Sequence, residues 1–288
     1  MDKIFDAMTS WLEELLGEAV LGNLTDMVSI VNEKVGTIAS DVSQTPANFS
    51  PSIYNMIRNI SETVIIPIAG IIMTIIACYE LIQLIIEHNN LQHMETWIFL
   101  KWILKTYIAI YLISNTFNIV MAVFDVAQYV VNQSAGLITG STSLDPSMLD
   151  SMRRAVQNMG AGELFGLYIQ TEIVLFIMNA LSAIIFVIIY ARMIEIYLMV
   201  SMAPIPFATF GNKEQSHIGQ NYLRSIAALA FQAFLIIICV GIYAVLIQTG
   251  VRSANVSGAM WGIVGYTVLL CYTLFKTGAL SKSIFAAH

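Results

Sequence analysis

Five charged side chains within or beside long apolar runs have types and spacing that could do chemistry. They are Glu80, Lys101, Lys105, Arg192 and Glu195. A charged group inside a membrane costs several kcal/mol unless it is paired or hydrated, so each of these residues is a candidate functional residue. Such groups either take part in transport or hold neighbouring helices in register.

Glu80 lies about one and a half helical turns from the end of its apolar run. Lys101 and Lys105 lie at a similar depth in the next apolar run, and the short polar linker between the runs suits an antiparallel hairpin. We therefore predict an ion pair between Glu80 and one of the two lysines. The pair either fixes the register of the hairpin or serves a transport role.

Two prolines, Pro204 and Pro206, interrupt a later apolar stretch. Each removes a backbone donor and clashes with the preceding turn at a cost of roughly 3 kcal/mol or more, so both cannot lie inside a regular helix. In lipid, the freed backbone groups must be buried in protein or reach water. We expect residues 191–211 to bend at the inner face of a membrane, with the other helices packed around the break.

Arg192 and Glu195 precede this break and are three residues apart, a spacing at which side chains can pair along one helix. The predicted pair has two interpretations. It lies at the headgroup level, or it holds the break at residues 203–207 against the next span or subunit.

The sequence shows no other pattern that indicates chemistry. His88 and His93 lack the His-Glu-x-x-His spacing of a zinc site, and all three cysteines lie in apolar runs. Neither a phosphate-binding loop nor a nucleophile elbow occurs in the sequence. We therefore expect no catalytic residue, no metal and no cofactor.

The composition predicts a polytopic all-α membrane protein. Of the 288 residues, 57% are hydrophobic and only 11% are charged, whereas soluble domains carry about 25% charged residues. The formal net charge of −6 argues against continuous binding of DNA, because DNA phosphates require clustered lysine and arginine.

Five apolar runs are long enough to cross a hydrocarbon core, which takes about 20 helical residues. The runs cover residues 64–86, 97–124, 167–200, 222–248 and 257–277. They define a transmembrane domain, residues 61–280, with an outer loop at 125–162, an inner loop at 208–221 and a cytoplasmic tail at 281–288. Within the outer loop, residues 147–158 are expected to form a short amphipathic helix.

Lysine and arginine near the span ends predict the orientation, because cytoplasmic loops carry an excess of both. One side of the membrane collects Lys101, Lys105, Arg192, Lys213, Arg224, Lys276 and Lys282. That side is expected to be cytoplasmic, which places the N-terminus outside and the C-terminus inside. If residues 196–210 crossed by themselves, the chain would have six crossings and both termini would share a side.

Residues 1–60 are predicted to form an extracytoplasmic amphipathic region. Apolar side chains recur at helical spacing over residues 2–21, with acidic side chains on the other face. Gly22 and Asn23 are expected to end this helix, and residues 24–40 to form a second, weaker one.

The acidic face of the first helix indicates a protein partner, because helices that lie on membranes usually present a basic face to anionic lipid. Packing against a partner or another copy is therefore favoured over lying on the outer lipid surface. Trp11 and Leu15, on the apolar face, are candidate interface residues. Gly258 and Gly262 are two further candidates, since their Gly-x-x-x-Gly spacing permits close helix approach in membranes.

The second half of the chain resembles a known family. The resemblance rests on the run 191–198, the Ala203-Pro204-Ile205-Pro206-Phe207 break, Gly211-Asn212-Lys213-Glu214, and the segment 220–235 that begins Gln220-Asn221-Tyr222-Leu223-Arg224. These residues look like those of TrbL-type conjugal transfer proteins, the polytopic inner-membrane subunits of type IV secretion machines. The match is to versions carried by conjugative elements of Gram-positive bacteria. Its specific part covers residues 165–280, and the N-terminal half agrees only in layout.

The resemblance implies a function that spacing alone does not show. Such subunits are channels or scaffolds of the bacterial cell membrane and form a homo-oligomeric ring, often five-fold, at the base of the DNA translocation path. Implied partners are stalk proteins, cytoplasmic ATPases, membrane lipid and, transiently, the DNA–relaxase complex. Because separate ATPases supply the energy, the family carries no catalytic residues over to this chain.

The alternative is a secondary transporter with a broken-helix substrate site. Such proteins place broken helices around a midplane site and often contain an internal inverted repeat. Here the proline break lies near an interface, and the sequence shows no repeat. A third hypothesis, a membrane protease or transferase, requires an acid, base or metal constellation that the sequence lacks.

Overall fold

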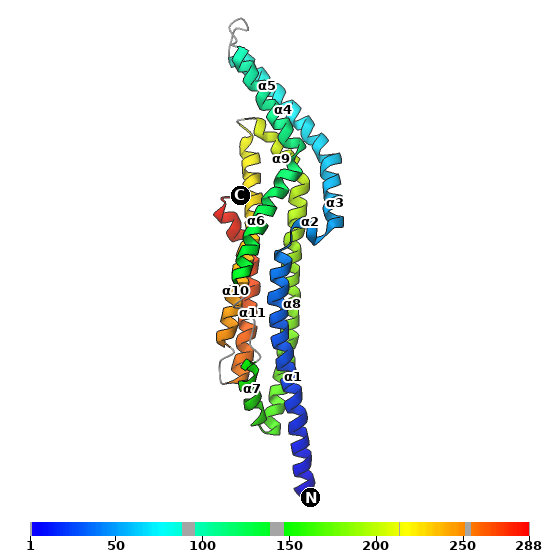
Figure 1. Ribbon diagram of the computed structural model, residues 1–288, viewed down its shortest axis with the longest axis vertical. Coiled ribbons are helices and arrows are strands. Elements are labelled where there is room, and N and C mark those ends of the chain that lie inside the picture. Colours follow the sequence, from blue (N-terminus) through cyan, green and yellow to red (C-terminus); the bar gives the residue numbers. More distant parts are fainter. Residues whose placement is uncertain (1, 88–95, 139–146, 213, 251–254, 288) are drawn as a thin grey trace. The chain divides into compact units, whose positions relative to one another are not determined.

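The computed structural model describes residues 2–87, 96–138, 147–212, 214–250 and 255–287, and all regular structure within these ranges is helical (Figure 1). The predicted all-α class is therefore confirmed. The helices are α1 (Asp2–Val42), α2 (Pro46–Phe49), α3 (Pro51–Ile60), η1 (Ser61–Ile65), α4 (Ile66–Glu87), α5 (Thr96–Ser114), α6 (Thr116–Ile138), α7 (Ser147–Gln157), α8 (Ala161–Met202), α9 (Pro204–Ala208), η4 (Thr209–Gly211), α10 (Ser216–Gly250) and α11 (Val256–Ile284).

Five stretches of helix in the described part of the chain are long and apolar enough to cross a membrane, which makes this a multi-pass membrane protein. They are Pro51–Glu87, Thr96–Ser114, Ala161–Gly211, Ser216–Thr249 and Val256–Ile284. The structure thus agrees with the five spans that the sequence predicts.

The chain divides into two compact units. Unit 1 comprises Met1–Ser43, Val131–Ile189 and Phe234–Thr277, and unit 2 comprises Gln44–Val130, Tyr190–Ala233 and Gly278–His288. Each unit brings together segments that are far apart in the sequence, so neither corresponds to a continuous domain.

In unit 1, α1 buries one face along its C-terminal half. The buried residues recur at spacings of three and four, as along a helix–helix seam: Val20, Leu24, Met27, Val31, Val35, Ile38 and Val42. Nδ2 of Asn23 donates hydrogen bonds to Thr171 Oγ1 at 2.9 Å and to Glu172 Oε1 at 3.0 Å. These bonds place α1 beside α8 (Figure 1).

The expected helix end at Gly22 and Asn23 is wrong, because α1 continues without interruption to Val42. A glycine inside a helix costs only about 1 kcal/mol relative to alanine. Burial of the seam on both sides of Gly22 outweighs that cost. Asn23 turns its side chain to α8, where its amide is hydrogen-bonded, and therefore does not compete for the helix backbone.

The other helices of unit 1 are joined by buried polar contacts. The Tyr243 hydroxyl on α10 lies 2.8 Å from Thr267 Oγ1 on α11. Ser257 Oγ, at the start of α11, donates to Gln170 Oε1 of α8 at 2.7 Å. The predicted short helix in the 125–162 region is present as α7, and Ala161 N donates to Glu13 Oε1 of α1 at 3.0 Å.

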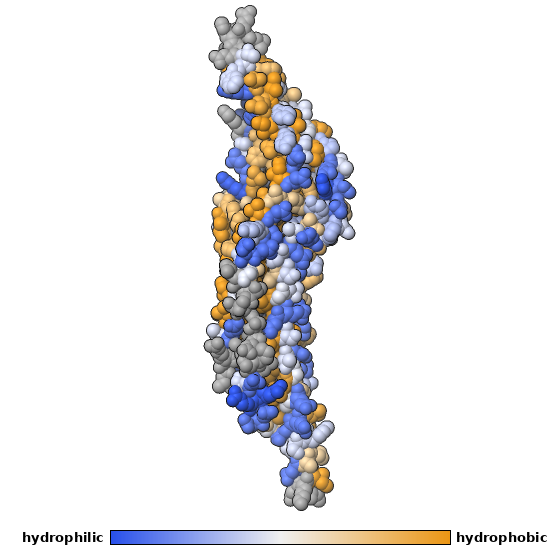
Figure 2. Space-filling model, viewed as in Figure 1, coloured by the Kyte–Doolittle hydropathy of each residue, from blue (hydrophilic) through white to orange (hydrophobic). Residues whose placement is uncertain are grey.

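The core of unit 2 surrounds the proline break. Buried residues of α3 to α6 meet those at the end of α8, in α9 and at the start of α10, for example Met73, Phe117, Ile196, Phe207 and Ile226. The α4 and α5 hairpin presents much of its remaining apolar surface outward (Figure 2). Exposed large side chains on α5 include Ile103, Leu104, Tyr107, Ile108, Ile110 and Tyr111.

The predicted second span, residues 97–124, is divided into α5 and α6 at Asn115. Two side chains at this point bond to backbone carbonyls of the preceding turn. Thr116 Oγ1 donates to the carbonyl oxygens of Leu112 at 2.8 Å and Ile113 at 2.9 Å, and Asn115 Nδ2 donates to that of Tyr111 at 2.9 Å. Local bonds of this kind compete with the helical ladder and bend helices.

Several segments expected to be loops or a tail are helical. The region 125–162 contains the end of α6 and all of α7, and the inner loop at 208–221 contains η4 and the start of α10. The tail at 281–288 begins inside α11. His88, His93 and Lys213 lie outside the described residues.

The seam of α1 yields a first prediction. Leu24→Ala should lower the free energy of unfolding by about 2–5 kcal/mol, because it leaves a cavity at a fully buried site. Thermal unfolding of the monomer in a dissociating detergent would measure the effect. Leu12→Ala, at an exposed position on the same helix, is the matched control and should cost less than about 1 kcal/mol. Equal losses would contradict the seam.

Candidate functional site

The break at the end of α8 is the feature around which unit 2 is arranged. Helix α8 ends at Met202, and α9 begins with Pro204 in its first turn, where a proline lacks no intrahelical hydrogen bond. The turn η4 follows, and α10 starts at Ser216. The predicted interruption after Met202 is therefore confirmed. The expectation that the two prolines cannot share a helix is wrong, because Pro204 and Pro206 are the first and third residues of α9, where a proline N has no intrahelical acceptor.

Side chains bond to several backbone groups around the break. Thr209 Oγ1 donates to the carbonyl oxygen of Pro206 at 2.7 Å and accepts from Gly219 N at 3.1 Å. Asn212 Oδ1 accepts from Glu214 N at 2.7 Å, just before α10 begins. These bonds satisfy part of the backbone around the break within the protein, as a membrane environment requires.

Gly219 lets the start of α10 lie directly against the break. A Cβ atom at this position would be 2.8 Å from the carbonyl oxygen of Pro206 and 3.0 Å from the ring of Phe210. No side chain larger than hydrogen fits at such a distance from backbone. The close approach also brings Gly219 N within reach of the Thr209 hydroxyl.

Aromatic side chains connect the break to its neighbours. The Phe207 ring meets those of Phe210 and Tyr222 edge-on, with centroids 5.3 and 6.1 Å away. The Tyr222 hydroxyl donates to the carbonyl oxygen of Met199 at 2.7 Å, which ties α10 to α8. The Tyr197 hydroxyl donates to the carbonyl oxygen of Pro46 at 2.6 Å, which ties α8 to α2.

The α4 and α5 hairpin packs against α9 and η4. A Cβ atom at Gly211 would lie 3.2 Å from Cε of Met73 and 3.9 Å from Cβ of Ala109, so both helices approach the turn closely. Within unit 2, the expectation that other helices pack around the break is confirmed.

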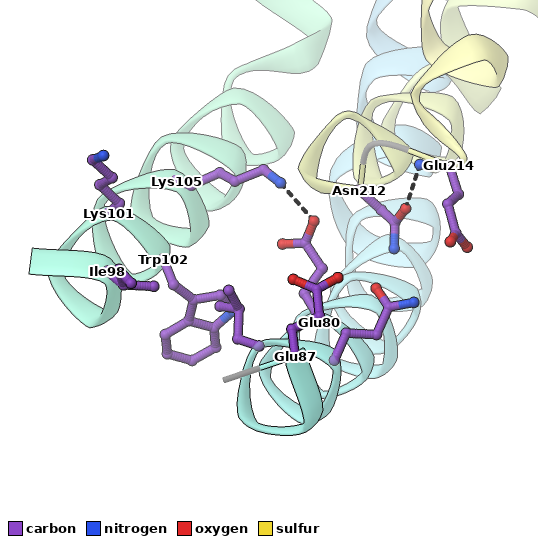
Figure 3. A pocket seen from close by; sticks show the side chains of 10 residues that line it. Glu80, Glu87, Ile98, Lys101, Trp102, Lys105, Asn212 and Glu214 are labelled. Carbon is purple, nitrogen blue, oxygen red and sulfur yellow. Dashed lines mark hydrogen bonds and ion pairs between the residues drawn. The ribbon is translucent and has the colours of Figure 1, made fainter. Parts of the chain in front are cut away.

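The predicted ion pair between the hairpin helices is also present. Lys105 Nζ on α5 lies 2.5 Å from Glu80 Oε1 on α4 (Figure 3). Lys101 is not the partner of Glu80; its ammonium lies 5.4 Å from the centre of the Trp97 ring. That the pair fixes the register of the hairpin stays a prediction, and so does the alternative, a transport role.

The predicted pair between Arg192 and Glu195 does not form. Glu195 Oε1 instead lies 3.3 Å from Lys282 Nζ at the end of α11, and both side chains are about half exposed. Arg192 points into the protein and is only 6% exposed, with Nη1 3.8 Å from Met193 Sδ. Its Nε is buried without a hydrogen-bond partner among the described residues. The two residues therefore lie in different surroundings although they are three positions apart.

The interface candidates are not used for packing within the described chain. Trp11 is 61% exposed and Leu15 is 50% exposed. A Cβ atom at Gly258 would meet only the side chain of Asn255, and one at Gly262 would meet no atom within 4 Å. Any close approach at Gly258 or Gly262 has to come from beyond the described residues.

Several residues that support this region were missed by sequence reasoning. Thr209, Gly219 and Tyr222 act through contacts that only the fold creates. Ser281 Oγ donates to the carbonyl oxygen of Ala228 at 2.5 Å and joins α11 to α10, and no local pattern indicates this bond. Asn212 could have been found, because an asparagine shortly before a helix is a typical capping residue.

The charged groups of the described residues do not gather into a metal centre. No group of three or more His, Cys, Asp or Glu side chains in this part of the chain could hold a metal ion. The region instead contains a hydrogen-bonded helix break and two ion pairs, Glu80–Lys105 and Glu195–Lys282. This arrangement is a structural one.

Gly219→Ala tests the close approach at the break. We expect a loss of about 1–3 kcal/mol in unfolding free energy, because the added methyl group meets a backbone carbonyl oxygen. Gly265→Ala, where a Cβ meets no atom within 4 Å, should be neutral or slightly stabilising. Thermal unfolding in detergent compares the two, and the idea fails if both variants behave alike.

A double-mutant cycle tests the ion pair. Glu80→Gln and Lys105→Gln, alone and together, should show a coupling of about 1 kcal/mol in unfolding experiments. The same cycle at Glu195 and Lys282 should give less than about 0.5 kcal/mol, because both partners are well exposed. Coupling of equal size in both cycles would show that burial of Glu80 has no effect.

Comparison with known proteins supports one family. The family model described as "TrbL/VirB6 plasmid conjugal transfer like protein" matches residues 31–204. The match covers the N-terminal half from residue 31 onward, where the resemblance extended only to layout, and it ends inside the break at Pro204. Of residues 165–280, on which the resemblance rests, it therefore covers residues 165–204. A search of curated proteins found no match, and neither did a search of solved structures. Because the matched residues are more than half of the 288, the chain belongs to the TrbL/VirB6 family of plasmid conjugal transfer-like proteins.

Proposed function

We propose that this protein is a channel or scaffold subunit of a type IV secretion machine and forms a homo-oligomeric ring at the base of the translocation path. The family is one of structural membrane subunits of conjugal transfer systems. In such a ring, the partners of this chain are further copies of itself, stalk proteins, cytoplasmic ATPases and, transiently, the DNA–relaxase complex.

The observation that carries the ring is the exposed apolar face at the start of α1. Its members are Ile4, Phe5, Met8, Trp11, Leu12 and Leu15, all exposed. Helix α1 is not among the candidate membrane spans of the described chain, so lipid in a transmembrane arrangement does not account for this face. Contiguous apolar surface of this kind is typical of a protein interface.

The helix geometry separates this face from the seam inside unit 1. Trp11 and Leu24 are 13 positions apart, so their side chains point in directions about 140° from each other. The C-terminal half of α1 is already packed through Leu24. The Trp11 face is therefore directed away from the chain's own core and is available to another copy.

The acidic residues of this part of α1, which lie off the Trp11 face, suit the same arrangement. Asp6 and Glu14 are exposed, and Glu13 is held by Ala161 N. Negative charge near a conduit repels DNA phosphates and therefore discourages tight binding. Conduction requires weak binding. In the proposed orientation, the N-terminus and α1 lie outside the cell membrane and the C-terminus lies in the cytoplasm.

A paired substitution tests assembly directly. Trp11→Ser together with Leu15→Ser should convert the oligomer to monomers in mild detergent and abolish DNA transfer, while membrane insertion is unchanged. Asp6→Ser with Thr9→Ser, on the other side of the same helix, is the matched control and should assemble normally. Size-exclusion chromatography with light scattering, electron microscopy of the particles and a mating assay give the readouts.

Two outcomes would contradict the proposal. One is normal oligomers in the Trp11 and Leu15 variant. The other is a monomeric native particle that carries out ion-coupled uptake in vesicles, which would support the secondary transporter instead.

A further inference from the structure

A polar cavity of about 450 Å³ lies at the end of the α4 and α5 hairpin, beside the turn that leads into α10 (Figure 3). Its lining is charged on every side. Glu80 and Glu87 come from α4, Lys101 and Lys105 from α5, and Glu214 from the turn.

Two apolar grooves continue from this cavity. One, of about 260 Å³, shares Lys101 and Lys105 with it and runs along α5 past Ala109 to Leu112. The other, of about 470 Å³, shares Trp102 with it and lies between α4 and α5, bounded by residues such as Ile66 and Ile113. Both grooves follow candidate membrane spans, so their direction is that of lipid acyl chains.

Trp102 stands where the polar cavity meets the second groove, because it lines both. Its indole Nε1 is buried and has no hydrogen-bond partner among the described residues. A buried donor without an acceptor is costly, and a ligand oxygen at this position would remove the cost. Phosphate and ester oxygens of a glycerophospholipid lie at such a junction between polar head and apolar chains.

The charges of the cavity select among headgroups. Among the described lining residues, three carboxylates and two ammonium groups give a formal net charge of −1, and Glu80 and Lys105 already neutralise each other. A headgroup with negative charge alone would face an excess of carboxylates. A headgroup with both a phosphate and an ammonium group would match the lysines of α5 and the carboxylates of Glu87 and Glu214, all of which line the cavity.

We propose that the α4–α5 hairpin binds one glycerophospholipid whose headgroup carries both a phosphate and a free ammonium group. The headgroup occupies the polar cavity, Trp102 Nε1 donates to a phosphate or ester oxygen, and the acyl chains follow the two grooves. The charged lining also disfavours the other candidate occupant, an apolar helix of a second copy, because it would bury these charges without partners.

This site is independent of the proposed ring, since every residue in it belongs to unit 2 and the Trp11 face belongs to unit 1. The lipid can therefore be tested whether or not the ring forms. A failure of the Trp11 and Leu15 variant to dissociate would leave the lipid proposal unaffected.

Lipid binding is measured on the purified full chain by native mass spectrometry and by thermal shift. The probes are phosphatidylethanolamine, phosphatidylcholine and phosphatidylglycerol with the same acyl chains, and inorganic phosphate with ethanolamine as the soluble arm. Phosphatidylethanolamine should be retained and should stabilise the protein most. Phosphatidylcholine should bind more weakly because its quaternary ammonium cannot donate hydrogen bonds to Glu87 and Glu214.

Trp102→Phe removes the indole donor and keeps an aromatic ring. It should weaken phosphatidylethanolamine binding by about three- to tenfold, the effect of one lost hydrogen bond to a charged or carbonyl acceptor. Trp261→Phe, at a partly exposed ring on α11 away from the cavity, is the matched control and should stay within about twofold. Circular dichroism and the elution profile establish that both variants fold.

Glu87→Gln with Glu214→Gln should reduce the preference for phosphatidylethanolamine over phosphatidylglycerol by about threefold or more, because the ammonium group loses its carboxylate partners. Equal binding of the three lipids to the unaltered protein would overturn the proposal. So would equal effects of the two tryptophan variants, or stabilisation by inorganic phosphate alone. A native oligomer without retained lipid would show that another copy fills the grooves.

Discussion

Every backbone amide and carbonyl that lies in lipid must find its hydrogen-bond partner inside the protein, and around the proline break side chains serve several of these groups. Thr209 serves two backbone groups at once, and Asn212 serves the start of α10. Gly219 makes the arrangement possible because only hydrogen fits beside the carbonyl of Pro206. The α4 and α5 hairpin then closes over the turn, so the interruption is the centre of unit 2 and not a defect in a span.

The same requirement governs the charges. Glu80 is mostly buried and has Lys105 as its partner, whereas Glu195 and Lys282 form a more exposed contact. Arg192 is the exception, since its Nε is buried without an acceptor in the described chain. Trp102 is in the same situation, but it borders a polar cavity with room for a ligand. The adjoining cavity is the reason why Trp102, and not Arg192, indicates a binding site.

The spans, the break and the Glu80 ion pair could be predicted because each depends on local patterns: apolar length, proline chemistry and the depth of charges on adjacent helices. The uninterrupted course of α1 could not, since burial of its seam outweighs the glycine at position 22. The division at Asn115 and the fate of Arg192 also escaped prediction. Both depend on where a side chain points once the helices are packed, and spacing along one helix does not determine that direction.

Helix α1 has two apolar faces on one unbroken rod, and this couples the inside of unit 1 to whatever covers the outside. The seam through Leu24 fixes the rotation of the helix about its axis, and that rotation sets the direction in which Trp11 points. Inserting a single residue between them would swing the outer face by about 100° without removing one apolar side chain. The number of residues between the two faces therefore decides whether two copies can pack together. Chains of equal composition but unequal spacing would be unable to assemble with one another.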